Sequence, residues 1–174
     1  MSNLINVYLG LGTNLGNRRE NLRAGLTFLS KELDIRKHSS IYETDPWGYL
    51  DQPKFLNMVC CVGTELAPTD LLDFCKSIEL KVGREPTFDL GPRVLDIDIL
   101  SYGDMVFESP SLTIPHPKLA ERAFVLVPLV EVNPEWLHPK SGANVGELLG
   151  QVSPESHVEV WEDHITAGIL GSGL

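Results

Sequence analysis

The chain has few of the features that direct a protein to a membrane or out of the cell. None of its apolar runs reaches the roughly 18 residues of a membrane-spanning helix. Its first residues lack the basic region and the long apolar stretch of a secretory signal. Only three cysteines are present, Cys60, Cys61 and Cys75, an odd number without the spacing of metal ligands. We therefore expect a cytoplasmic protein with no membrane partner, whose cysteines are reduced thiols in the core.

Positive charge is also scarce. The 174 residues include 14 Lys and Arg against 24 Asp and Glu, which gives a net charge of −10. This balance argues against broad nucleic-acid binding, because such binding needs a basic surface. No Lys or Arg follows residue 140, whereas five acids do: Glu147, Glu155, Glu159, Glu162 and Asp163. Residues 151–174 are therefore expected to be an acidic, solvated extension of unassigned role.

Hydrophobic periodicity predicts alternating strands and helices within a single domain at residues 1–150. Strands are expected at residues 6–12, 35–44, 55–65 and 94–100, and helices at residues 18–33 and 68–82. The order β-α-β-β-α-β is typical of a ferredoxin-like fold, in which both helices cover one face of the sheet. We therefore predict an α+β protein with a ferredoxin-like core and a C-terminal extension of loop and short helix, the latter near residues 146–149.

One predicted strand carries two acidic residues. In GPRVLDIDIL, residues 91–100, Asp96 and Asp98 lie two apart, so both carboxylates point to the same face. The pair fits the solvated face of an edge strand, or a site where divalent cations hold phosphate groups. We expect this largely apolar strand to be central or nearly central in the sheet, which favours the second interpretation. Arg84 and Arg93 precede the pair, and the forked guanidinium group is suited to phosphate.

A second cluster of polar residues lies in TIPHPKLAERAFV, residues 113–125. His116 lies between two prolines, and Lys118 and Arg122 are spaced to share a helical face. Taken alone, the two cations are equally well explained as surface charge, and His116 as a packed, hydrogen-bonded imidazole. Their occurrence together with the aspartate pair favours a phosphate site.

Aromatic residues cluster at predicted loop boundaries, where Trp47, Tyr49, Phe55 and Phe124 are found. Phe55 and Asn57 share one face of a strand. An aromatic ring beside an amide suits a flat heterocycle, because the ring stacks and the amide offers a paired donor and acceptor. Taken by themselves, both phenylalanines are better explained as ordinary core residues.

These segments together resemble a known family, the 6-hydroxymethyl-7,8-dihydropterin pyrophosphokinases of folate biosynthesis. The resemblance covers residues 7–139 and leaves out the segment after Gly150. It is carried, in family order, by YLGLGTNLGNRRENL, SSIYETDPWGYLDQPKFLNMV, IELKVGRE, GPRVLDIDILSYGD and LTIPHPKLAERAFVLVPLVEV. It implies transfer of the β,γ-pyrophosphoryl group of ATP to the hydroxymethyl oxygen of the pterin, with release of AMP.

The resemblance also implies roles for single residues. Asp96 and Asp98 would bind two Mg²⁺ ions, and Arg84, Arg93 and Asp98 would serve catalysis. The positions implied to bind ATP are Glu79, Arg84, Arg93, Ile99, Thr113, His116 and Arg122. The positions implied to bind the pterin are Thr44, Phe55, Asn57 and Phe124. We expect a monomer with small-molecule substrates and no nucleic-acid partner.

The chain departs from the common family pattern at a few positions, among them Leu90, where many members have Trp, and Pro117, where some have Tyr. Two other functions remain open on the residues alone. Carboxylate pairs on similar sheets also serve nucleotidyl transfer, which would release inorganic pyrophosphate instead of AMP. The same fold also serves as a ligand-sensing module without turnover, although such a module has no need of arginines beside a carboxylate pair.

Overall fold

The structure is a computed structural model that describes residues 3–153 and 156–163. Its strands are β1 (Ile5–Thr13), β2 (Asp34–His38), β3 (Ile41–Thr44), β4 (Phe55–Thr64), β5 (Asp96–Tyr102), β6 (Phe107–Glu108), β7 (Thr113–Ile114) and β8 (Val158–Glu162). Its helices are α1 (Arg18–Leu29), α2 (Pro68–Val82), the 3₁₀ helix η1 (Leu119–Glu121), α3 (Ala123–Val132) and α4 (Val145–Gln151). The predicted βαββαβ order is present, which confirms the ferredoxin-like core.

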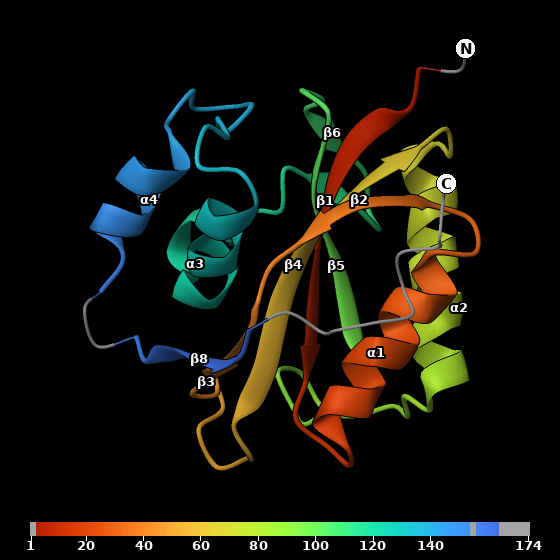
Figure 1. Cartoon of the computed structure of the whole chain (residues 1–174), viewed down its shortest axis with the longest axis vertical. Coiled ribbons are helices and arrows are strands. Elements are labelled where there is room, and N and C mark those ends of the chain that lie inside the picture. The colour runs from red at the N-terminus through yellow and green to blue at the C-terminus, as the bar shows by residue number, and fades with distance from the viewer. Residues whose placement is uncertain (1–2, 154–155, 164–174) are drawn as a thin grey trace.

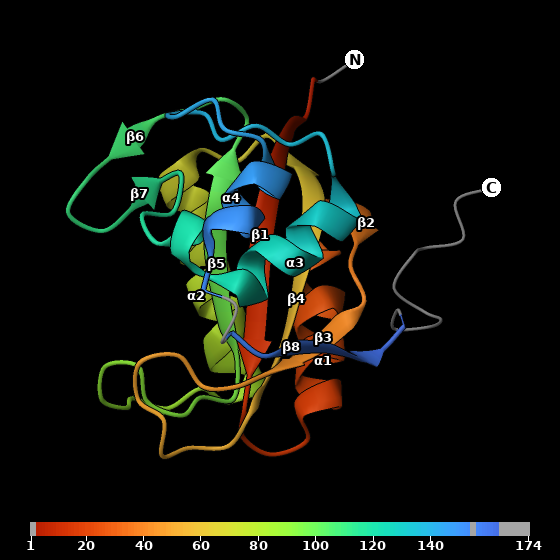
Figure 2. The same cartoon turned by 90° about the vertical axis from the view of Figure 1, so that its left-hand side faces the viewer.

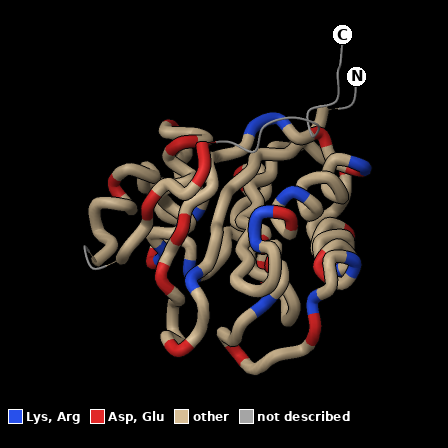
Figure 3. The backbone as a smooth tube through the Cα atoms, turned by 60° about the horizontal axis from the view of Figure 1, so that its bottom comes forward, with Lys and Arg blue, Asp and Glu red and all other residues tan. Residues whose placement is uncertain are grey.

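Six of the described strands form one sheet in the order β5-β1-β4-β3-β8, with β2 also paired to β4, and β6 and β7 form a separate two-stranded sheet. All of these pairs are antiparallel. Helices α1 and α2 cover one face of the sheet, and α3 and α4 lie on the other (Figure 1). No helix of the described residues is long and apolar enough to cross a membrane. Basic and acidic positions are interspersed along the backbone (Figure 3).

Local signals explain where the two core helices begin and end. The Asn17 side chain caps α1 by accepting a hydrogen bond from the Glu20 backbone N–H. Pro68 occupies the first turn of α2, where its missing N–H has no cost, and Gly83 ends the helix with φ 114°. Apolar residues at helical spacing, such as Leu22 and Leu26, face the sheet and are fully buried.

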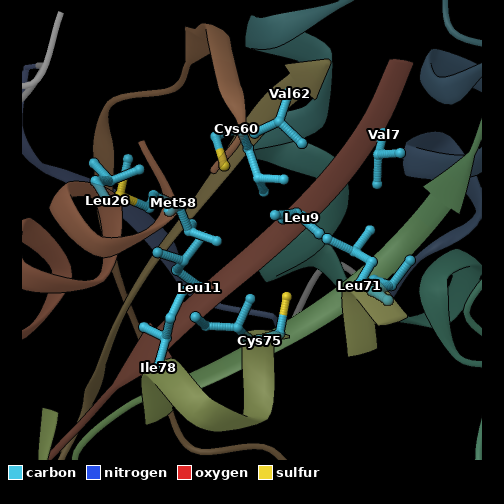
Figure 4. Packing of buried hydrophobic residues seen from close by; sticks show 14 of the residues in the cluster. Val7, Leu9, Leu11, Leu26, Met58, Cys60, Val62, Leu71, Cys75 and Ile78 are labelled. Atoms are coloured by element: carbon cyan, nitrogen blue, oxygen red, sulfur yellow. The ribbon is translucent and has the colours of Figure 1, made fainter. Parts of the chain in front are cut away.

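The core between the sheet and α1 and α2 is apolar. Figure 4 shows Leu9 and Leu11 of β1 packed among residues of β4, α1 and α2, including Leu26 and Ile78. Cys60, Cys61 and Cys75 are buried and unbridged, as the sequence predicts. Burial raises the pKa of the Cys75 thiol to about 12, so these cysteines behave as small core residues.

Strand alternation gives the opposite face a different character. Leu9, Leu11, Ile97 and Ile99 belong to the core under α1 and α2, so the residues between them in β1 and β5 point toward α3. On that face a second apolar cluster, which includes Leu100, Val125 and Leu126, seats α3 and α4. This cluster covers only part of the sheet, and the remainder of the face carries the site described below.

The expectation that the strand with the two aspartates is central in the sheet is wrong. Among the described strands β5 pairs only with β1 and therefore forms an edge of the main sheet. Its apolar residues are buried because helices and loops cover them: Ile78 of α2 packs in the same cluster as Ile97, and the His116 N–H donates to the Leu100 carbonyl. An apolar strand covered in this way has the same sequence pattern as a central one.

Two further features were not predicted. The expected strand at residues 35–44 is broken into β2 and β3, because the Ser39 hydroxyl accepts from the Val59 N–H and donates to the Ser40 carbonyl. The acidic extension, expected to be solvated, contributes β8, which runs antiparallel to β3 (Figure 2). Glu162 of β8 binds the Arg19 guanidinium through both carboxylate oxygens, at 2.8 and 2.9 Å.

Candidate active site

A cavity opens on the α3 face of the sheet, where α3 and α4 leave β1, β4 and β5 uncovered. Two irregular segments border it: residues 45–54, between β3 and β4, and residues 83–95, between α2 and β5. Most of the expected site is gathered in one place. The cavity is lined by nine of the residues to which the resemblance assigns a role: Thr44, Phe55, Asn57, Arg93, Asp96, Asp98, His116, Arg122 and Phe124.

Two glycines of β1, Gly10 and Gly12, line the floor of the cavity. In the sheet Gly10 lies opposite Asp98, and Gly12 lies between Asp96 on one side and Asn57 on the other. A Cβ atom at Gly12 would lie 2.7 Å from the Asn57 Oδ1 atom, closer than atoms pack. Glycine at these two positions therefore leaves room above the strand and lets the amide keep its place.

The two aspartates have different surroundings. Asp96 is held by arginines on both sides: Arg84 Nη1 lies 2.8 Å from its Oδ1, and Arg93 Nη1 lies 3.4 Å from its Oδ2. Within residues 3–153 and 156–163, the cationic partner of Asp98 is a distant one, Arg122 Nη1 at 3.8 Å. Burial and the charge of Asp96 raise the pKa of Asp98 to about 7. The ionised form of Asp98 is therefore less favoured than that of an exposed carboxyl group.

Glu79 lies behind this pair, inside the protein. Its Oε1 accepts the Ile97 N–H at 2.8 Å, and its Oε2 lies 2.9 Å from Arg84 Nη1. Only 3% of Glu79 is exposed, and burial raises the pKa of its carboxyl above the usual range. Arg84 thus bridges two carboxylates, Glu79 on α2 and Asp96 on β5, which holds its guanidinium at the edge of the aspartate pair.

His116 and Arg122, which flank η1, also line the cavity. The His116 Nδ1 accepts the Lys118 N–H at 3.2 Å, and burial together with the charge of Arg122 lowers the pKa of His116 to about 4. The imidazole is therefore neutral at pH 7. The Arg122 guanidinium lies 4.9 Å from the centre of the Trp47 ring and 5.5 Å from that of Phe124. The Arg122 Nε is buried and donates to no acceptor among the described residues.

The aromatic end of the cavity is built from three elements. Phe55 and Asn57 come from β4, Phe124 comes from the first turn of α3, and Thr44 comes from the end of β3. The Asn57 Nδ2 donates to the Thr44 hydroxyl at 2.7 Å. This hydrogen bond fixes the orientation of the amide and therefore the direction in which its Oδ1 points. Arg93 lies over the Phe55 ring, 5.6 Å from its centre. Rings and amide are therefore adjacent to the carboxylates in a single cavity.

Four residues implied by the resemblance do not line this cavity. Arg84 is paired with Glu79 and Asp96. Glu79 is behind the cavity, Ile99 is 3% exposed in the core under α1 and α2, and Thr113 lies in β7. Their role as nucleotide contacts stays a prediction. For Ile99 the physical reason is the strand period, which turns its side chain away from the face of Asp98.

Sequence reasoning also missed residues that join the two bordering segments. Asn14 exchanges two hydrogen bonds with the Arg93 backbone, through its N–H at 3.1 Å and its Oδ1 at 2.8 Å. Its Nδ2 donates to Gln52, and the Gln52 amide donates to the Leu90 carbonyl at 2.8 Å. The alternate glycines of NVYLGLG were a signal for the open floor. No local pattern pointed to Asn14 or Gln52, because their partners are distant in sequence.

Comparison with known proteins agrees with this geometry. The family described as 7,8-dihydro-6-hydroxymethylpterin-pyrophosphokinase (HPPK) matches residues 8–134. The chain belongs to this family. Membership confirms the family that the sequence motifs predict.

Among its relatives is the 2-amino-4-hydroxy-6-hydroxymethyldihydropteridine pyrophosphokinase of Aquifex aeolicus, 44% identical over 133 residues, or 76% of this chain and 83% of the relative. The folic acid synthesis protein fol1 of Schizosaccharomyces pombe is 40% identical over 169 residues, or 96% of this chain. This chain spans only 23% of that longer relative. A match of 169 residues includes β8, so the similarity extends beyond Gly150.

A solved structure shows the same fold. The Plasmodium falciparum HPPK-DHPS with pterin and p-hydroxybenzoate superposes with a TM-score of 0.69 at 18% identity, over 86% of this chain and 42% of the other. At this identity the likeness supports the architecture alone.

Proposed function

We propose that the cavity on the α3 face binds ATP and 6-hydroxymethyl-7,8-dihydropterin together and transfers the pyrophosphoryl group between them. The observation that carries this proposal is the union, in one cavity, of a carboxylate pair flanked by arginines with an aromatic and amide end. The first half suits a metal-bound polyphosphate, and the second suits a flat heterocycle. Their adjacency would bring the acceptor hydroxyl beside the phosphates.

We propose that Asp96 and Asp98 hold two Mg²⁺ ions. The described residues contain no group of three His, Cys, Asp or Glu side chains that would enclose a metal on its own. This fits Mg²⁺, which usually binds one or two carboxylates and completes its shell with phosphates and water. The raised pKa of Asp98 supports the assignment, since its ionised form lacks a close cationic partner. When bound, the ions would neutralise phosphate charge and lower the pKa of the attacking hydroxyl.

The arginines of the site would then stabilise charge on the phosphates. Transfer of a phosphoryl-type group depends on positioning and charge neutralisation more than on covalent help. Arg84 and Arg93 lie beside Asp96, Arg122 lies nearer to Asp98, and His116 lines the same cavity. We assign Arg84 and Arg93 to charge that develops on the transferred group and on AMP. Because the Nδ1 of neutral His116 already accepts the Lys118 N–H, its Nε2 would donate a hydrogen bond without adding charge.

At the other end we propose that Phe55 and Phe124 stack on the two faces of the pterin. Asn57 would read the polar edge of the heterocycle, because its orientation is set by Thr44. The contact of Glu79, Ile99 and Thr113 with the nucleotide is proposed on the resemblance alone. Arg84 contacts Glu79, so Glu79 would act on the phosphates through that arginine.

The proposal is tested by the products of the reaction. AMP formation from ATP that requires both Mg²⁺ and the hydroxymethyl pterin supports pyrophosphoryl transfer. Release of inorganic pyrophosphate would instead show nucleotidyl transfer, and tight binding without any turnover would show a sensing module. We further propose that the chain is monomeric, which light scattering of the active protein measures directly.

A further inference from the structure

Trp47 lies at the centre of a stack of rings and cations. Its ring centre is 4.9 Å from the Arg122 guanidinium carbon and 5.0 Å from the Lys118 ammonium nitrogen. Arg122 in turn lies 5.5 Å from the Phe124 ring centre, so its guanidinium is shared by two aromatic rings. The three elements involved are the segment between β3 and β4, the turn around η1 and the start of α3.

The backbone beside Trp47 is suited to holding the ring in this place. Gly48 has φ 86°, a conformation that favours glycine, and a Cβ atom there would lie 2.5 Å from the Leu90 Cδ1. The segment is also tied down through Gln52, whose amide donates to the carbonyls of Tyr49 and Leu90. The segment that carries Trp47 is therefore hydrogen-bonded to residues 83–95. The Trp47 ring itself belongs to neither core cluster.

Arg122 has little other support. Its nearest carboxylate oxygen, on Asp98, is 3.8 Å away, and its buried Nε has no acceptor among the described residues. Lys118 and Arg122 repel each other across the same ring unless an anion lies nearby. An aromatic face attracts a cation while leaving its N–H groups free. Arg122 is thus held in place with hydrogen-bonding capacity directed to a further acceptor.

We propose that Trp47 is the positioning residue for Arg122 and that it acts on the nucleotide side of the reaction, although it comes from the segment that leads into the pterin-binding strand. The Trp47 ring holds the Arg122 guanidinium against the wall of the cavity. The guanidinium can then bind a phosphoryl oxygen of ATP without a prior loss of side-chain freedom. This inference rests on the proposed function, because it takes the anion to be the triphosphate. If Trp47 were only a packing residue of the pterin pocket, its substitution would weaken binding of the pterin instead.

The test compares Trp47→Leu, which keeps an apolar side chain, with Trp47→Phe, which keeps an aromatic face. Titration calorimetry with Mg²⁺ and a non-hydrolysable ATP analogue measures binding without turnover. Trp47→Leu is expected to lower the affinity for the analogue by roughly three- to thirtyfold, which is the range of a cation–π contact. Trp47→Phe is expected to restore most of the affinity. In steady-state assays Trp47→Leu should raise the KM for ATP and leave the KM for the pterin little changed.

A double-mutant cycle separates positioning from packing. In the background of Arg122→Met, which keeps an unbranched side chain and removes the guanidinium and its charge, Trp47→Leu should cause no further loss of analogue binding. Trp161→Leu, a change of the same kind on the exposed strand β8, serves as the control and should bind the analogue like the wild type. Thermal unfolding checks that each variant is folded.

The inference is overturned if Trp47→Leu binds the analogue as well as the wild type, or if its effect persists in Arg122→Met. It is also overturned if the change acts mainly on the KM for the pterin. Failure of the proposed function would look different, because the wild-type protein would then form no AMP from ATP and the pterin, whatever its affinity for the analogue.

Discussion

On the face of the sheet covered by α1 and α2, β1 and β5 contribute Leu9, Leu11 and Ile97 to a closed apolar core. On the other face the neighbouring positions of the same strands hold glycine and aspartate, and the surface opens into a cavity. The period of two along a strand makes this division possible, because a strand can stabilise the fold with one set of residues and bind ligands with the other. Stability and activity should therefore respond to different substitutions within one strand.

The largest expected effect is on activity, from Asp98→Ala on the cavity face. One carboxylate is insufficient to hold two cations against a triphosphate, so we expect the rate of AMP formation at saturating Mg²⁺ to fall by about a thousandfold, or ~4 kcal/mol. The raised pKa of Asp98 means that its ionised form disfavours the folded state at neutral pH, so the free energy of unfolding should not fall. If Asp98→Ala kept more than a small fraction of the wild-type rate, the assignment of Asp98 as a Mg²⁺ ligand would be contradicted.

The converse substitution is Leu9→Ala, on the core face of β1. Leu9 is fully buried, and loss of such a side chain costs about 2–5 kcal/mol of the free energy of unfolding. The rate per folded molecule should stay close to that of the wild type. Urea unfolding and the rate at a temperature well below the transition measure the two quantities. A large loss of rate with little loss of stability would show that the two faces are not independent.

A smaller effect is expected at the glycine floor. Gly12→Ala places a Cβ atom 2.7 Å from the Asn57 Oδ1 and should displace the amide, raising the KM for the pterin by about tenfold, or ~1.4 kcal/mol. Gly10→Ala is the matched control on the same strand face, since its Cβ atom would meet Leu100 at an ordinary 3.5 Å. Equal effects of the two substitutions on the KM for the pterin would mean that the contact with Asn57 is not what requires glycine.

The smallest expected effect is a change in how stability depends on pH. The pKa of His116 is lowered to about 4 in the folded protein, from an ordinary value of 6.5. As the pH falls from 6.5 toward 4 the unfolded chain gains a proton that the folded protein does not, so His116 lowers stability in this window. His116→Asn should therefore lose less stability between pH 7 and pH 5 than the wild type does. Urea midpoints at the two pH values measure the difference, and parallel losses would contradict it.

Local pattern was sufficient for several features. The helix predicted at residues 68–82 is α2 without change, because Pro68 and Gly83 mark its two ends and apolar spacing marks its face. The common direction of Asp96 and Asp98 follows from the period of a strand alone. The family also followed from short motifs, since most residues to which we assign phosphate, metal and pterin binding lie in continuous segments around residues 44–57, 91–98 and 113–124.

Tertiary structure decided what depends on partners far apart in the chain. The position of β5 at the edge of the sheet, the pairing of β8 with β3, and the contact of Trp47 with Arg122 each join distant segments. A residue's own sequence context records its preferred conformation and which face it shares with its neighbours. It does not record which distant side chain will lie against that face, because that choice depends on how the whole chain packs. The sequence by itself therefore determined the elements, the family and the chemistry available, and only the packed structure determined which cation meets which carboxylate or ring.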